Sequence, residues 1–283
     1  MQPPIISNNI TNGLYWLPED KRTTYPFSTV SRAIVCNQEY YPNEYTEPKN
    51  IGYTRPVWAD PQDVSTIKFN QVDGNVNRVS HTGVYSLDTN GRPLCPLGRT
   101  GITGRGILGC WGPNHAADPI VTRYKRDSFG IIMLDQNGHQ RIEFVAIKRR
   151  DNGQWAIPGG MVERGTDVSK TLRTEFGEEA LATLEASPED KLKLSSAVEN
   201  FFSKGLKLVF KGVVHDWRNT DNAWMETVAV VFHDYTGDVV SKFPLKAGDD
   251  AGDVAWTEIV PSMNLFASHS DFVMKARDII LSS

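Results

Sequence analysis

The sequence has few cysteines, no long apolar run and no excess of basic charge, and each absence excludes a class of protein. Cys36, Cys95 and Cys110 are dispersed and form no C-x-x-C pair. This argues against a disulfide framework or a zinc site and favours a reducing compartment. No apolar stretch approaches the roughly 20 residues of a membrane-spanning helix. The 283 residues carry a net charge of -4, so nucleic acid is not expected as the main partner.

The first residues also lack the features of targeting segments. No basic residue precedes Lys21, and neither a signal-peptide core nor the Arg-rich character of a transit peptide is present. We therefore expect a cytoplasmic protein, located at the cytosolic face of a membrane if the chain is part of a channel. A mitochondrial location is the less favoured alternative. The sequence leaves open whether Met1 is a natural start.

Composition and patterning divide the chain into two parts. Apolar residues make up 40% and charged residues 23%, as in ordinary globular proteins. The first part is irregular, with strand-length pieces at Ile67–Phe69 and Val84–Leu87 on either side of an Asp-Gly turn. From about Pro119 the pattern becomes α/β. We predict a smaller, irregular, β-containing N-terminal cap domain over residues 1–118 and an α/β domain over residues 119–283.

The second part alternates strands with helices. Strands are expected over residues 142–148, 206–214, 225–233 and 254–256, and helices over residues 188–204 and 263–281. Pro188 suits an early helical position, and Gly205 suits the position after the helix. This order predicts helices that cover a mixed sheet.

A glycine-rich segment joins the two parts. Four glycines between Gly98 and Gly106 alternate with Arg99 and Arg105. Backbone N–H groups and guanidinium groups in such a loop are able to bind phosphate. The spacing fits neither a Walker A loop nor a dinucleotide fingerprint. A structural crossover between domains is the favoured interpretation.

The stretch Gly159–Leu181 combines a glycine loop with a predicted helix. Three of its glutamates stand at i, i+3 and i+4, which places them on one helical face: Glu175, Glu178 and Glu179. Apolar residues at a four-residue step predict a buried face beside them: Val168, Leu172, Phe176 and Ala180. Clustered carboxylates are ligands that Mg²⁺ prefers, usually together with substrate phosphates. A plain acidic surface helix is the alternative.

The same stretch resembles the Nudix box, G-x5-E-x7-R-E-U-x-E-E-x-G-U, in which U is apolar. Counted from Gly160, the chain keeps the acidic and apolar positions of the pattern at Glu175, Phe176, Glu178 and Glu179. It departs at Thr166, Thr174 and Leu181, which stand in place of Glu, Arg and Gly.

Two of these departures are expected to compensate for each other. The loop Glu and the box Arg commonly form an ion pair in the family, and losing both partners together can be nearly neutral. Thr166 is then available to cap the helix N-terminus. Arg173 and Glu163 lie beside the vacated positions as partial substitutes.

Flanking segments narrow the resemblance to one subgroup. They read GRTG..GRG.L...GPNHAADPI.TR, WAIPGGMVE, RNTDNAWMET, AGDDAG and LFASHS, and they cover about residues 55–275. They are similar to the two-domain ADP-ribose pyrophosphatases of animals and to the C-terminal Nudix domain of ADP-ribose-gated melastatin-type channels.

This resemblance implies a Nudix α/β/α sandwich that hydrolyses ADP-ribose to AMP and ribose 5-phosphate. The implied cofactor is Mg²⁺, with Mn²⁺ as the alternative, and the implied metal ligands are Gly160, Glu175, Glu178 and Glu179. The three glutamates are also the predicted catalytic residues, together with Asp250, whose carboxylate is placed to orient water.

By analogy with ligand contacts in the family, seven residues are candidate ADP-ribose contacts: Thr122, Trp155, Asp216, Arg218, Phe266, Ser268 and His269. Arg218 suits phosphate or ribose oxygens. Phe266 or Trp155 suits stacking on adenine.

Two other functions compete with ADP-ribose hydrolysis. One is an ADP-ribose sensor, part of a channel polypeptide, with weak or no hydrolysis. The other is a Nudix hydrolase for a dinucleotide polyphosphate or a nucleotide sugar. The intact glutamate triplet favours an active enzyme over a sensor.

Overall fold

The computed structural model describes residues 42–52, 55–203, 207–248 and 251–283. They form two compact units. The first comprises the described residues up to Ser65, together with Tyr85–Gly112 and Asp216–Trp224. The second comprises Thr66–Val84, Pro113–His215 and Met225–Ser283. The boundary predicted between residues 118 and 119 stays a prediction.

The first unit has little regular structure. Strands β1 (Asn43–Thr46) and β4 (Ile102–Gly106) pair in parallel, and a 3-10 turn, η3, spans Pro48–Asn50. Arg105 of the glycine-rich segment is fully buried. Its guanidinium donates to the carbonyls of Gly109 at 2.6 Å and Asn50 at 2.8 Å and lies over the Trp111 ring. Arg105 therefore ties this unit together, and the crossover between domains expected for this segment stays a prediction.

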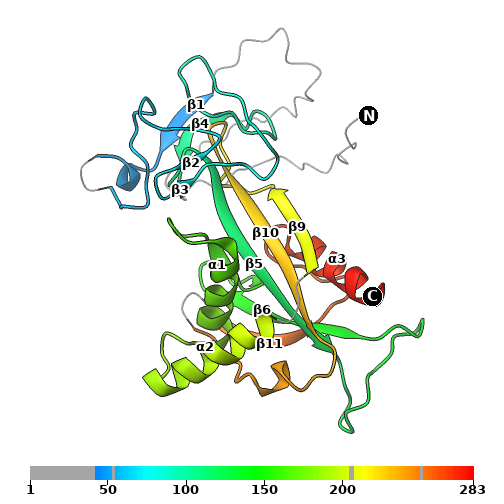
Figure 1. The fold of residues 1–283 in the computed structure, drawn as a ribbon. Coiled ribbons are helices and arrows are strands. Elements are labelled where there is room, and N and C mark those ends of the chain that lie inside the picture. Colours follow the sequence, from blue (N-terminus) through cyan, green and yellow to red (C-terminus); the bar gives the residue numbers. More distant parts are fainter. Residues whose placement is uncertain (1–41, 53–54, 204–206, 249–250) are drawn as a thin grey trace. The chain divides into compact units, whose positions relative to one another are not determined.

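The second unit is built on a seven-stranded sheet (Figure 1). Its strand order is β11 (Ala251–Glu258), β6 (Ile142–Arg149), β5 (Gly112–Tyr124), β10 (Ala223–Asp234) and β9 (Lys207–Val213). Two short strands join it: β7 (Trp155–Ala156) pairs with β6, and β8 (Gly160–Met161) pairs with β5. The helices are α1 (Val168–Glu175), η4 (Phe176–Ala180, a π-helix), α2 (Pro188–Phe202), η5 (Val240–Lys242) and α3 (His269–Leu281).

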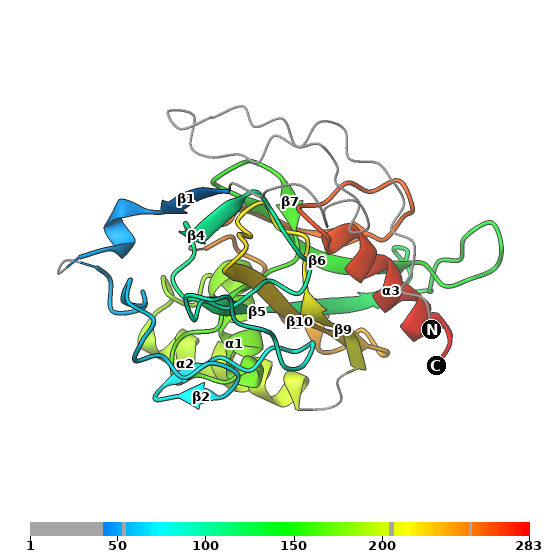
Figure 2. The ribbon, with the colours of Figure 1, turned by 90° about the horizontal axis from the view of Figure 1, so that it is seen from above.

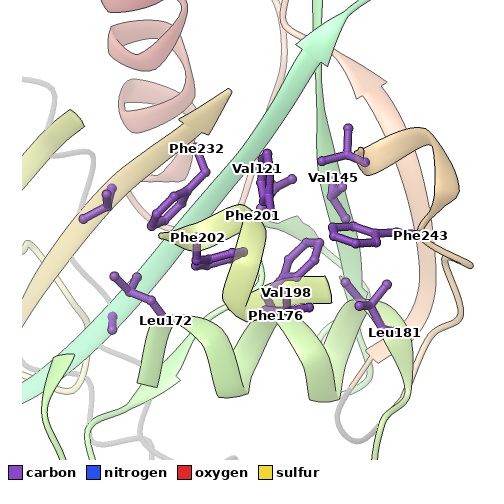
Figure 3. Packing of buried hydrophobic residues seen from close by; sticks show 14 of the residues in the cluster. Val121, Val145, Leu172, Phe176, Leu181, Val198, Phe201, Phe202, Phe232 and Phe243 are labelled. Atoms are coloured by element: carbon purple, nitrogen blue, oxygen red, sulfur yellow. The ribbon is translucent and has the colours of Figure 1, made fainter. Parts of the chain in front are cut away.

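Alternating strand residues bury both faces of this sheet. Val121, Val145 and Phe232 pack against α1, η4 and α2, as Figure 3 shows. On the opposite face of the sheet, Ile120 and Phe144 pack against α3. Figures 1 and 2 show α1 and α2 on one side of these strands and α3 on the other. The predicted α/β/α sandwich is confirmed.

Several element predictions need correction. Ile67–Phe69 and Val84–Leu87 are not strands; a hairpin of β2 (Val72–Asp73) and β3 (Val76–Asn77) forms between them instead. Its two-residue turn contains Gly74 at φ 62°, a conformation that glycine adopts without strain and that suits a tight hairpin. The turn residues, not the short apolar pieces, therefore determine where pairing starts.

The helix ends also differ from the prediction. Pro188 lies in the first turn of α2 after an N-capping Ser187, as expected, but Gly205 is outside the described residues. The last helix begins at His269, six residues later than predicted, because Ala267 has φ 48° and interrupts a helical path. No helix within the described ranges is long and apolar enough to span a membrane.

Candidate functional site

Helix α1 places the predicted carboxylates against the sheet. The helix begins after Asp167, whose carboxylate accepts a hydrogen bond from the amide of Lys170. The prediction that Thr166 is the cap is therefore wrong by one residue. A carboxylate at this position satisfies a free amide and also interacts favourably with the positive end of the helix.

The apolar face of this helix holds it in place, as predicted. Leu172, Phe176 and Ala180 are buried in the core, and Val168 packs against them. Phe176 has no exposed surface and contacts the rings of Phe202 and Phe243 (Figure 3). Burial of one such side chain stabilises the fold by about 1.5–3 kcal/mol.

The glutamates stand where the α-helix changes to a π-helix. Glu175 is the last residue of α1, and Glu178 and Glu179 lie inside η4. A π-helical turn is wider than an α-helical one and is frequently found at functional sites. The predicted helix is therefore present, but its second part is a π-helix and not the expected α-helix.

Glu179 is fixed by the first glycine of the loop. Its carboxylate is 5% exposed and accepts the amide of Gly159 at 2.8 Å. A side chain at Gly159 would meet Asp118 Oδ1 at 2.3 Å. The other oxygen of Asp118 accepts a hydrogen bond from the Thr227 hydroxyl at 2.6 Å. Glu179, the loop and strands β5 and β10 therefore form one connected network.

Glu175 lies against the second glycine of the loop. A Cβ built on Gly160 would meet Glu175 Oε1 at 2.3 Å and Oε2 at 2.6 Å. Only glycine leaves the carboxylate this space. Gly160 also pairs with Ala117 in the β5–β8 ladder, which fixes the loop relative to the sheet.

The donor set suits a hard divalent cation. Carboxylates from one helix converge with the backbone of the Gly159–Gly160 loop, and Mg²⁺ and similar ions prefer oxygen ligands. The Glu175 carboxylate occupies the space that a Cβ on residue 160 would fill. The residues present therefore fit a metal of this class.

The acidic loop before β11 lies against the end of the π-helix. The amides of Lys246 and Gly248 donate to the carbonyls of Ala180 and Glu179, at 2.9 and 3.2 Å. A Cβ on Gly248 would be 2.5 Å from the Glu178 carbonyl. Asp250, predicted to be catalytic, lies outside the described residues.

Four predicted ligand contacts gather near the start of α3: Trp155, Phe266, Ser268 and His269. The Phe266 amide donates to the Trp155 carbonyl at 2.8 Å, and the rings of Phe266 and His269 lie edge to face at 5.6 Å. His269 Nδ1 accepts from the Ile157 amide at 3.0 Å, which places the proton of a neutral ring on Nε2. Ser268 lies directly before His269, at the N-terminus of α3.

The backbone of this segment is strained. Ala267 has φ 48°, which is uncommon for a residue with a side chain. Such conformations persist where the surrounding structure imposes them, and they cluster at ligand sites. Here the strain lies between Phe266 and Ser268, two of the predicted contacts.

The other predicted contacts have protein partners. Thr122 is fully buried, and its hydroxyl lies 3.3 Å from the Phe232 carbonyl and 2.9 Å from His233 Nδ1. In the first unit, the Arg218 guanidinium donates to both carboxylate oxygens of Asp216 at 2.7 Å. The ligand roles of these residues stay predictions.

Arg173 does not take the place of the missing box arginine. Its guanidinium pairs with Glu199 of α2 at 3.0 Å and donates to Ser169. The side chain of Arg173 points toward α2. The expectation that Arg173 takes over the role of the missing arginine, because it is the neighbouring residue in the sequence, is therefore wrong.

Sequence reasoning missed the residues that support the glutamates. Asp118, Thr227 and Gly248 act through contacts with distant parts of the chain. Each lies in a segment that resembles the subgroup, and that similarity was the available signal.

Comparisons with known proteins identify the domains that the chain resembles. The profile of the "NUDT9-like, N-terminal domain" matches residues 31–112, and that of the "NUDIX domain" matches residues 124–260. The rat protein "ADP-ribose pyrophosphatase, mitochondrial" is 48% identical over 266 residues, which cover 89% of this chain and 75% of the rat protein. "Putative nudix hydrolase 6" of Caenorhabditis elegans is 47% identical, with 83% and 82% covered.

A third relative is a channel. "Transient receptor potential cation channel subfamily M member-like 2" of Nematostella vectensis is 47% identical over 271 residues. The match covers 90% of this chain and 17% of the channel. The chain thus corresponds to most of two hydrolases and to a small part of one channel.

Proposed function

The chain belongs to the Nudix hydrolase family, and we propose that it hydrolyses the diphosphate of ADP-ribose to AMP and ribose 5-phosphate. The observation that carries this proposal is the contact of both Glu175 and Glu179 with the Gly159–Gly160 loop. An acidic surface helix has no need for two carboxylates held by adjacent glycines. A sequence identity of 48% to an ADP-ribose pyrophosphatase supports the choice of substrate.

Nudix hydrolases use a divalent metal, and we propose Mg²⁺ as the cofactor, with Mn²⁺ as the alternative. Glu175, Glu178, Glu179 and the backbone of Gly160 would hold it. When bound, it supplies neutralisation of the diphosphate charge and a more acidic water.

The chain's own groups position the reacting atoms. The Gly159 amide orients Glu179, and the space at Gly160 orients Glu175. In the reaction, a water oxygen bonds to one phosphorus, and the bridging oxygen leaves with the other phosphate. We propose that Asp250 orients this water, because a carboxylate beside the attacking water can accept the proton that the water loses. Correct positioning accounts for much of the acceleration in phosphoryl transfer.

The group at the start of α3 is proposed to bind the nucleoside. Trp155 and Phe266 offer ring faces for adenine, and Ser268 and His269 offer polar atoms at a helix N-terminus, where anions are favoured. Trp155 and Gly160 lie in one segment, so at most about 18 Å separates their backbones. Thr122, Asp216 and Arg218 remain proposed contacts from the family resemblance.

An ADP-ribose sensor is the second candidate, because a channel relative is 47% identical over 90% of this chain. The deciding test incubates the chain with ADP-ribose and Mg²⁺, follows AMP by chromatography, and measures binding in parallel. The enzyme is expected to form AMP far faster than a Glu175→Ala control. Tight binding with no AMP above that control would make the chain a sensor. Parallel assays with dinucleotide polyphosphates and nucleotide sugars test the remaining substrates.

We propose ADP-ribose as the partner and do not expect nucleic acid to be one. The proposed location is the cytoplasm. The three cysteines, Cys36, Cys95 and Cys110, are dispersed along the sequence and form no C-x-x-C pair, which supports a reducing compartment. Membership of a larger channel polypeptide is proposed as the alternative context.

We also propose that residues 1–118 and 119–283 are separate domains. The two family profiles, which end at residue 112 and begin at residue 124, support a boundary in this interval. A chain that begins at Asp118 would lack half of β5, a strand inside the sheet order. It is expected to fold poorly, and full affinity of this truncated chain for ADP-ribose would contradict any role for the first domain in binding.

A further inference from the structure

Three potential metal ligands meet in the second unit at a place that the proposed hydrolysis does not use. They are His81, in the turn after β3, His115 of β5 and Glu226 of β10, and their ligand atoms all lie within 4.8 Å of one another. We propose that these three residues bind a divalent transition metal, with Zn²⁺ as the best match. This site is independent of the box glutamates and of the proposed function.

The imidazole nitrogens at this place are buried and poorly paired. His115 is 8% exposed, and neither of its ring nitrogens makes a hydrogen bond of ordinary geometry within the described residues, although the backbones of Asn77 and Val79 interact with the ring. His81 Nε2 is also buried and makes no hydrogen bond within the described residues. Buried polar atoms normally have partners, and a bound ion is one explanation for such exceptions. The two rings lie against each other, with centroids 4.6 Å apart.

The carboxylate is already oriented by its surroundings. Glu226 is fully buried. Its Oε1 accepts the Ser80 hydroxyl at 2.5 Å, and its Oε2 accepts the His81 amide at 2.6 Å. Hydrogen bonds of this kind fix ligating carboxylates in metal sites. Oε2 lies 3.9 Å from His115 Nδ1.

Burial disfavours the protonated form of both histidines. Burial is the main cause that lowers the pKa of His81, to about 4, and it also lowers the pKa of His115. The positive charge of Lys211 also lowers the pKa of both histidines. The same charge would repel a bound cation.

The geometry requires only a modest contraction. Ligands of a tetrahedral Zn²⁺ lie about 3.3 Å apart, given metal–ligand distances near 2.0 Å. Because the observed separations reach at most 4.8 Å, movement of His81 within its turn would close the site. Two histidines and a glutamate are a known zinc ligand set. A metal here would join the turn at Ser80–Thr82 to two neighbouring strands.

The test titrates Zn²⁺ into the chelator-treated full chain in excess Mg²⁺, in competition with a chromophoric chelator. The parent is expected to bind one Zn²⁺ with high affinity and to melt several degrees higher with it. His81→Ala and Glu226→Gln should weaken this binding on the order of tenfold or more. The matched control is His139→Ala, which removes an exposed histidine that also neighbours a carboxylate, Asp135 at 3.5 Å.

Two results would overturn the site. One is unchanged Zn²⁺ affinity in His81→Ala, a variant in a turn that does not threaten the core. The other is a loss of binding in Glu179→Gln with retention in His81→Ala, which would place the ion on the box glutamates. Circular dichroism checks that each variant is folded, and if Glu226→Gln unfolds, His81→Ala alone decides.

Discussion

Replacing Gly160 by alanine is expected to disable the enzyme without unfolding it. The added Cβ would lie 2.3 Å from Glu175 Oε1, and real Cβ atoms essentially never approach closer than 3.0 Å. The backbone at Gly160 is not in the left-handed region, so alanine adds no conformational strain of its own. The carboxylate has to move because it is the end of a flexible side chain.

The size of this movement determines the expected loss. An ordinary contact begins near 3.4 Å, so Glu175 Oε1 retreats by about 1 Å. A misplacement of about 1 Å can lower turnover about 100-fold, equivalent to about 2.7 kcal/mol in the transition state. Glu175 is only partly buried, so the melting temperature should change by no more than about 4 °C.

The assay measures AMP formation from ADP-ribose at saturating Mg²⁺, together with thermal unfolding. Gly252→Ala is the matched control, because a Cβ at this position in β11 meets Lys148 O at an ordinary 3.5 Å. This control should keep both its activity and its melting temperature.

A double-mutant cycle identifies the carboxylate involved. If Gly160→Ala acts by displacing Glu175, the double variant with Glu175→Ala should be no slower than Glu175→Ala alone. Parental activity in Gly160→Ala would refute the reasoning, and so would losses that multiply in the double variant.

Three further predictions concern single groups. Glu178→Gln and Glu179→Gln should each greatly lower AMP formation, while the melting temperature without metal holds or rises because a crowded charge is removed; unchanged turnover in both would exclude the metal site. Arg218→Ala should weaken ADP-ribose binding by roughly 1.5–3 kcal/mol and also lower the melting temperature, since buried Asp216 loses its partner; calorimetric binding equal to the parent would make Arg218 structural. Hydrogen bonds from Arg141 lower the pKa of Glu258 from 4.5 to about 2, so Glu258→Gln should lose about 1 kcal/mol of unfolding free energy above pH 4.5. That difference should vanish as the pH falls to 2, and urea unfolding that shows it constant across pH 2–7 would contradict the ion pair.

Local spacing accounts for what could be predicted. The glutamates and the buried face of the box helix lie within about four turns of one another, so helical geometry alone relates them. The box helix, its core contacts and its glycine loop were predicted for this reason. The change to a π-helix at Phe176 was not, because the apolar step of four residues fits both kinds of turn.

Contacts between distant segments could not be predicted in the same way. Gly159 meets Asp118 because β8 pairs with β5, and nothing in the 41-residue interval between them encodes that register. The same holds for His81, His115 and Glu226, which come from a turn and two strands and have no motif spacing. A one-residue slip of either strand would send its side chain to the opposite face. Such a site exists only once the sheet has formed, so metal binding would report on the register of β5 and β10. The same register brings Asp118 and Thr227 together. Asp118 in turn lies against Gly159, whose amide donates to Glu179.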